Sequence, residues 1–130
     1  MPAFPNAETA AEVFGELFTI LAADEEFTAK LRENDLTARL VHTKPDCTIF
    51  LSADKVIVGP EAPEDAAITI KMSCDTAHQL WLGKLMMPAA VATGKVRIRG
   101  KVAKVLELVP ILRPAFDRYP ELAAARGIGA

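Results

Sequence analysis

The most reactive side chains of this sequence are two cysteines and two histidines, and chemically useful residues stand close together at 74–78. Asp75 and His78 are three residues apart, so they can touch at the start of a helix. Cys74 precedes that helix start, where the pKa of a thiol can be lowered and the thiolate made nucleophilic. Cys74 also continues an alternation of apolar residues over 68–72, which favours a buried, inert thiol. His78 is interpreted as a helix-cap or surface residue, so an enzyme built on Cys74 or His78 is the weakest of three hypotheses.

Motifs that assemble a nucleophile, a base and a phosphate or oxyanion cradle are missing from the sequence. It has no G-x-G-x-x-G, P-loop, G-x-S-x-G or C-x-x-C pattern. His42 and His78 lie 36 residues apart, and neither has a second ligand at metal-binding spacing. We therefore predict no catalytic residue, no metal ion and no cofactor, and we predict that the protein is not an enzyme.

A basic strand is predicted over residues 95–101, where Lys95, Arg97, Arg99 and Lys101 alternate with apolar or small residues. The period of two places the four cations on one face, about 7 Å apart. They either form a solvated face or edge that resists aggregation, or bind an anion. For the second interpretation we assign Lys95, Arg97 and Arg99 to a lipid headgroup or to transient contact with an anionic membrane. Nucleic acid is not an expected partner, because no aromatic residues interleave with these bases.

Large apolar side chains are concentrated in two segments, a methionine-rich one at 81–88 and a helical stripe that runs to Phe116. On composition alone both segments indicate core packing. Methionine side chains also adapt to irregular surroundings, so such segments occur in pockets that accept varied lipids or peptides.

The composition describes one compact domain over residues 1–130. Hydrophobic residues make up 51% of the 130 residues, which argues against disorder. The formal net charge of −2 is uneven: residues 1–34 carry a net charge of −5, and residues 95–130 carry +5. No stretch reaches the roughly 18 uncharged apolar residues of a membrane span, and we see no secretory signal. Two cysteines indicate reduced thiols, so we expect a cytoplasmic protein.

The elements that must position these residues follow from the hydrophobic period. The period of 3.6 predicts helices from Asn6 to about Ala23 and from Asp24 to about Asn34, with Asn6 and Asp24 as N-caps. Alternation then predicts strands at 39–43, 47–52, 56–58, 68–74 and 95–101, the first four as an antiparallel meander. Further helices are predicted over 76–84 with Asp75 as N-cap, over 88–94, over 102–109, and weakly after Pro120. The fold class is therefore α+β, with helices covering one face of a sheet.

Residues 65–101 resemble the sterol carrier protein 2 family of lipid-binding domains. The matching features are the strand that ends at Met72-Ser73, the Leu82-Gly83-Lys84 element, Pro88, and Gly94 before a strand that closes at Gly100. Together with the preceding meander and the following amphipathic helix, the likeness covers roughly residues 7–112. Its order and spacing are more specific than any single feature.

The resemblance implies a five-stranded, largely antiparallel sheet covered by helices that enclose an apolar tunnel. It also implies non-catalytic intracellular binding and transfer of fatty acids, fatty acyl-CoA, phospholipids, sterols or isoprenoids. Two departures from the family pattern are Lys101 and a C-terminal extension over residues 113–130, which could cap or fill the mouth of the tunnel. The predicted lining of the tunnel is Trp81, Leu85, Met86, Val91, Leu106, Val109, Leu112 and Phe116.

The second hypothesis is an accessory module that docks on a lipid or quinone biosynthesis complex, with the exposed bases and the proline-containing extension as its contact surface. The sequence does not indicate an oligomeric state.

Overall fold

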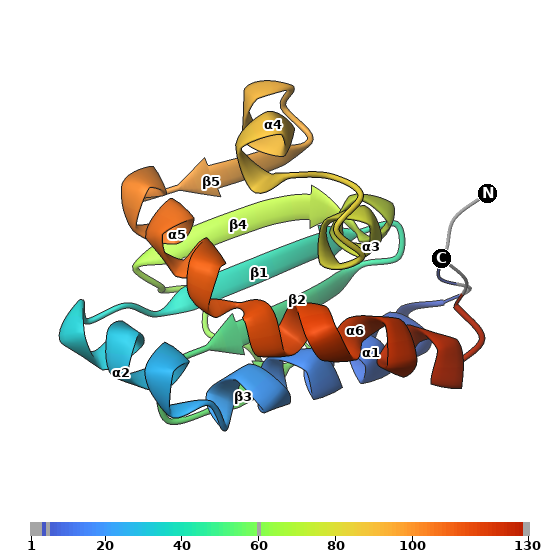
Figure 1. Cartoon of the computed structure of the whole chain (residues 1–130), viewed down its shortest axis with the longest axis horizontal. Helices are drawn as coiled ribbons and strands as arrows, with labels where there is room; N and C mark the ends of the chain where they lie inside the picture. Colours follow the sequence, from blue (N-terminus) through green and yellow to red (C-terminus); the bar gives the residue numbers. More distant parts are fainter. Residues whose placement is uncertain (1–3, 5, 60, 129–130) are drawn as a thin grey trace.

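A computed structural model describes residues 4, 6–59 and 61–128. One face of a five-stranded sheet is covered by helices, as the α+β prediction requires (Figure 1). In chain order the elements are α1 (Ala7–Ala22), α2 (Glu25–Glu33), β1 (Ala38–Thr43), β2 (Cys47–Leu51), β3 (Val56–Val58), β4 (Ile68–Ser73), α3 (Cys74–Trp81), α4 (Met87–Ala92), β5 (Val96–Arg99), α5 (Val102–Leu108), the short 3-10 helix η1 (Val109–Ile111) and α6 (Arg113–Ala125).

The strand order is β3-β2-β1-β4-β5, and three of the four pairings are antiparallel. The largely antiparallel sheet is confirmed, but the meander ends at β3. Strand β4 pairs in parallel with β1, with Ala38 opposite Ile68. The reason is the crossover between β3 and β4, whose residues 61–67 pass over the sheet face that the helices leave uncovered. There the Arg39 guanidinium donates a hydrogen bond to the Pro63 carbonyl oxygen over 3.0 Å. This crossover places β4, whose apolar residues need burial, beside the central strand rather than at an edge.

Side-chain caps fix where the helices begin. The Asn6 and Asp24 side chains accept hydrogen bonds from the backbone N–H groups of Thr9 and Glu26, so both predicted N-caps are confirmed. The predicted Asp75 cap is wrong, because α3 begins directly after β4. Its N-cap is Ser73, whose hydroxyl accepts a hydrogen bond from the Thr76 N–H at 3.1 Å.

The C-terminal segment is a helix, α6, packed against α1. Helix α6 contains Pro114 in its first turn, where no N–H partner is needed, and Pro120 in its interior. The proline at 120 removes one helical hydrogen bond, and burial of the opposite face holds the helix in place. That buried face is made of Ala115, Tyr119, Leu122 and Ala123. The predicted extension 113–130 thus belongs to the core through Ile128, and its last two residues lie outside the described residues.

Ion pairs connect the two oppositely charged ends of the sequence. The Arg126 guanidinium lies 3.4 Å from the Glu12 carboxylate and 3.0 Å from the Glu16 carboxylate. These contacts join α6 to α1, which also lie side by side (Figure 1). The basic C-terminal third therefore partly neutralises the acidic N-terminal helix.

Candidate functional site

An apolar cavity of about 120 Å³ lies between the helix-covered face of the sheet and the helices above it. On the same measure one water molecule needs about 15 Å³, so the space is several times larger than a packing defect. Its lining consists of Phe18, Leu21, Phe27, Ala38, Leu40, His42, Leu51, Ile70, Met72, Leu80, Trp81, Gly83, Leu85, Met86, Met87, Val105, Leu108, Val109, Leu112 and Phe116.

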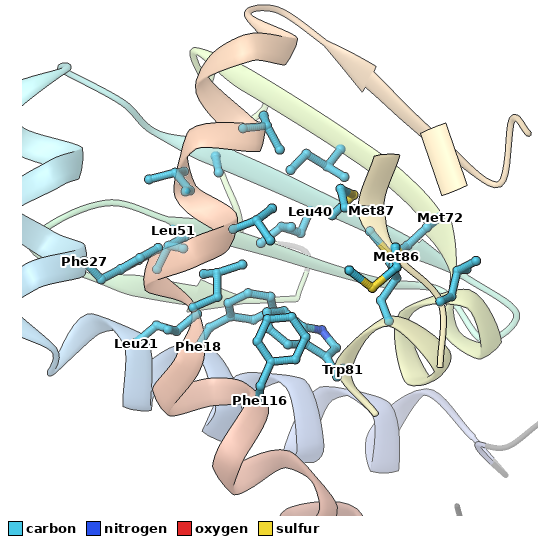
Figure 2. Close-up of a pocket in the computed structure, with 18 of the residues that line it drawn as sticks. Phe18, Leu21, Phe27, Leu40, Leu51, Met72, Trp81, Met86, Met87 and Phe116 are labelled. Atoms are coloured by element: carbon cyan, nitrogen blue, oxygen red, sulfur yellow. The ribbon is translucent and has the colours of Figure 1, made fainter. Parts of the chain in front are cut away.

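The sheet supplies the floor of the cavity and the C-terminal helices supply its roof. Alternation along β1 and β4 directs Leu40, His42, Ile70 and Met72 to the helix-covered face. The roof comes from α5, η1 and α6, which contribute residues between 105 and 116. Figure 2 shows that the lining extends from Phe27 and Leu51 at one end to Met72 and Met86 at the other.

Trp81 and Phe116 close one side of the cavity. Their ring centroids lie 5.2 Å apart. The Phe18 ring also contacts Trp81 edge to face, with ring centroids 5.9 Å apart. Met86, in contrast, is 66% exposed, so the loop that carries it forms a solvent-accessible lip. A ligand can therefore approach the cavity at the Met86 end.

Six of the eight residues predicted to line a tunnel form part of this cavity: Trp81, Leu85, Met86, Val109, Leu112 and Phe116. The other two, Val91 and Leu106, are outside the lining. Val91 is partly buried against the main core in α4, and Leu106 is 36% exposed on α5. Their contact with a ligand stays a prediction.

The apolar stripe of α5 and η1 that faces the cavity differs in part from the predicted one. The sequence groups Leu106 with Val105 and Val109, but the residues that face the cavity are Val105, Leu108, Val109 and Leu112. Both sets have helical spacing, so periodicity alone could not separate them.

The predicted basic residues Lys95, Arg97 and Arg99 are all exposed. Val96 is buried beneath the helices, so the residues that alternate with it face the opposite side of the sheet. Arg97 stands opposite Lys71 in the β4–β5 register, which confirms that the two cations share the uncovered face. These bases point away from the cavity, so they cannot hold the headgroup of a lipid that lies wholly inside it. Contact with a membrane stays a prediction.

His42 is the titratable residue of the cavity wall, and the sequence analysis gave it no role. Its imidazole Nδ1 lies 3.1 Å from the Cys47 carbonyl oxygen, and its ring stacks on Phe14 with centroids 4.5 Å apart. Only 2% of the residue is exposed, and burial lowers its pKa to about 4. The imidazole is therefore neutral at pH 7.

Comparison with known proteins agrees with this architecture. A model of the SCP-2 sterol transfer family matches residues 14–113. The chain belongs to this family. No curated protein sequence matches it.

Solved structures of other SCP-2 domains share the fold. Sterol carrier protein 2 from Yarrowia lipolytica, in its apo form, is 19% identical with a TM-score of 0.64, over 90% of this chain and 99% of that one. Sterol carrier protein 2 from Aedes aegypti, in complex with palmitate, is 19% identical with a TM-score of 0.60, over 82% and 96%. A UbiJ-SCP2 ubiquinone synthesis protein is 21% identical with a TM-score of 0.57, over 88% and 95%. SCP-2 domains are lipid-binding and lipid-transfer domains that are generally non-catalytic.

The candidate catalytic residues of this SCP-2 domain do not form a reactive group. Burial raises the pKa of the Cys47 thiol to about 11 and that of Cys74 to about 12, so both stay protonated. His78 is buried, and its Nδ1 lies 2.7 Å from the Tyr119 hydroxyl. Among the described residues, no cluster of three or more metal-ligating side chains occurs, and no helix is long and apolar enough to cross a membrane.

The pKa of His42 predicts how the stability of the domain depends on pH. In the unfolded chain the imidazole takes up a proton below about pH 6.5, whereas in the folded protein it stays neutral to about pH 4. The folded state therefore loses stability as pH falls from 6.5 to 4. We expect a loss of about 2 kcal/mol in the free energy of unfolding between pH 7.5 and pH 5 from this group. Urea denaturation at both pH values checks it, and a His42→Phe variant that loses as much as the wild type would contradict it.

Proposed function

We propose that this SCP-2 domain binds a lipid with a flexible aliphatic chain in the apolar cavity and shields it from water without chemical change. The observation that carries the proposal is the composition of the wall. Besides Gly83, its described lining residues are aliphatic, aromatic or thioether side chains, with the buried, neutral His42 as the exception. Such a wall excludes water and offers a chain no charged partner.

The free energy available is sufficient for binding. Each methylene transferred from water contributes about 0.8 kcal/mol, so twelve contribute about 10 kcal/mol before association and ordering costs are deducted. Micromolar binding requires about 8 kcal/mol net. Because association and ordering also cost several kcal/mol, a chain longer than twelve methylenes is needed to reach that range.

The roof must move to admit a whole chain. An apolar cavity of about 150 Å³ holds a molecule of the size of benzene, and the cavity here is about 120 Å³. We propose that loop 82–86 and the α5–η1–α6 roof separate when the ligand enters, since Met86 is already exposed and flexible methionines line that end. The palmitate complex of the Aedes aegypti protein supports an acyl chain as the ligand class. Fatty acyl-CoA, phospholipid, sterol and isoprenoid ligands remain further proposals of the same kind.

The second candidate function is an accessory module in lipid or quinone biosynthesis. It is supported by the likeness to the UbiJ-SCP2 ubiquinone synthesis protein and by the cationic uncovered face around Lys71, Arg97 and Arg99. The same face suits transient contact with an anionic membrane in a cytoplasmic setting. Charge reversal at Arg97 and Arg99 would remove either contact while leaving binding in the cavity unchanged.

Trp81 gives a direct test of the first proposal. It is the single tryptophan of the chain and lies in the cavity wall. Titration with palmitate is expected to change the intensity and the wavelength of its fluorescence saturably, because the bound chain changes the surroundings of the indole. Native mass spectrometry of the same samples should show one lipid per chain. An unchanged spectrum together with an apo mass would overturn the proposal.

A further inference from the structure

Among the described residues of the cavity wall, one side chain carries a nitrogen or oxygen atom that can accept a hydrogen bond. In that set only His42 and Trp81 have side-chain nitrogen or oxygen atoms, and an indole N–H can only donate. His42 is almost fully buried, and it is surrounded by Phe14 and by hydrophobic neighbours on β1 and β4. Burying a polar group without a hydrogen-bond partner costs free energy, so each nitrogen of this imidazole requires a partner.

The contact with Cys47 fixes which ring nitrogen carries the proton. The Cys47 backbone oxygen can only accept a hydrogen bond, so Nδ1 of the neutral imidazole must be the donor across the 3.1 Å contact. In that tautomer Nε2 has no hydrogen and presents a lone pair. The ring orientation is held by the stack on Phe14, whose plane is inclined by 3° to it.

The exposure of Nε2 follows from its lack of a hydrogen-bond partner. In the part of the chain that the structure describes, every fully buried side-chain nitrogen or oxygen has a hydrogen-bond partner. His42 makes its one hydrogen bond through Nδ1, so Nε2 keeps a small accessible surface. Since the residue is part of the cavity wall, that surface faces the space proposed for the lipid.

We propose that Nε2 of His42 accepts a hydrogen bond from the polar end of the ligand, so that the cavity selects aliphatic lipids with an O–H donor, an alcohol or an undissociated carboxylic acid. This inference rests on the proposed lipid binding. A carboxylate, an ether or an ester has no hydrogen to give, and its binding leaves Nε2 unpaired in an apolar surrounding.

The pairing of β1 with β4, which form the floor of the cavity, indicates the direction in which such a ligand lies. His42 stands opposite Met72, at the Met86 end of the cavity, and Leu40 and Ala38 follow along the same strand. From His42 to Ala38 the floor extends about 13 Å. The hydroxyl therefore lies at His42, and the chain follows β1 toward Phe27 and Leu51 (Figure 2).

Three compounds with the same myristyl chain distinguish the hydrogen bond to His42 from lipid binding itself. They are the alcohol, its methyl ether and the parent alkane. Binding is measured by Trp81 fluorescence at pH 7 with the wild type, His42→Phe and Thr43→Val. The phenyl ring keeps the stack on Phe14 and removes the acceptor. Thr43, the next residue of β1, faces the opposite side of the sheet and serves as the control.

The wild type and Thr43→Val are expected to bind the alcohol about tenfold more tightly than the ether, which corresponds to about 1.4 kcal/mol. His42→Phe is expected to bind the two equally. Equal affinities in the wild type, or a preference that survives in His42→Phe, overturn the hydrogen bond while lipid binding stands. Absence of binding by all three compounds overturns lipid binding itself.

A second measurement tests the hydrogen bond to Nε2 if His42→Phe does not fold. Nitrogen NMR of wild-type protein labelled at its histidines resolves Nε2 from Nδ1. The Nε2 resonance of His42 is expected to shift when the alcohol is added and to stay unchanged with the ether. Equal shifts with both compounds would overturn the proposal.

Discussion

Replacing Val109 by tryptophan is expected to abolish lipid binding while the domain stays folded. Val109 begins η1 in the roof, is only partly buried, and faces the cavity. An indole there occupies space that the chain would use. Loss of room for about four methylenes corresponds to about 3 kcal/mol, or a loss in affinity of roughly 100-fold or more. Titration with palmitate, followed by native mass spectrometry, measures the effect, and circular dichroism checks the fold.

The control for this substitution is Val102→Trp on α5. Val102 is 37% exposed and is outside the lining, so the same change of side chain should leave palmitate binding unchanged. If Val109→Trp unfolds the protein, the site is packed core. If it binds palmitate as the wild type does, the ligand lies elsewhere.

Removing residues 113–130 is expected to unfold the domain rather than detach an appendage. Tyr119, Leu122 and Ile128 are at least 95% buried, and each contributes about 1.5–3 kcal/mol by burial. Their loss approaches the whole stability of a typical domain, about 5–15 kcal/mol. It also breaks the ion pairs of Arg126 with α1. Thermal unfolding followed by circular dichroism should show no cooperative transition for the truncated chain.

A matched control lies on the outer surface of α6. Glu121 is exposed and pairs with Arg118 at 3.7 Å, so Glu121→Ala should change the free energy of unfolding by less than about 1 kcal/mol. A truncated chain that still unfolds cooperatively would show that α6 is dispensable for folding.

Local signals in the sequence predicted local structure well. The caps at Asn6 and Asp24, the five strands and the helical period all depend on neighbours within a few residues. The parallel pairing of β1 with β4 does not, because the crossover joins positions 30 residues apart, such as Ala38 and Ile68. Pro120 misled the prediction for a related reason: the packing of α6 on α1 outweighs the missing hydrogen bond.

The site could be predicted in part, again because local signals identify some of its residues. Trp81 and Phe116 are notable for their large side chains, and Val109 and Leu112 for their helical spacing. His42 does not, because its tautomer is set by a carbonyl group on the neighbouring strand and its burial by Phe14 on α1. A single histidine in a strand gives no sign of either contact.

The floor and the roof of the cavity also differ in when they are made. Synthesis proceeds from the N-terminus, so β1 and β4 leave the ribosome before the segment 105–116 that covers them. During that interval α1 and α3 can already pack on the sheet, whereas the side of Leu40, Ile70 and Met72 that faces the future roof is uncovered. The nascent chain therefore exposes its future binding surface before it can enclose it, and this is the stage at which a chaperone or a stray apolar molecule would meet it.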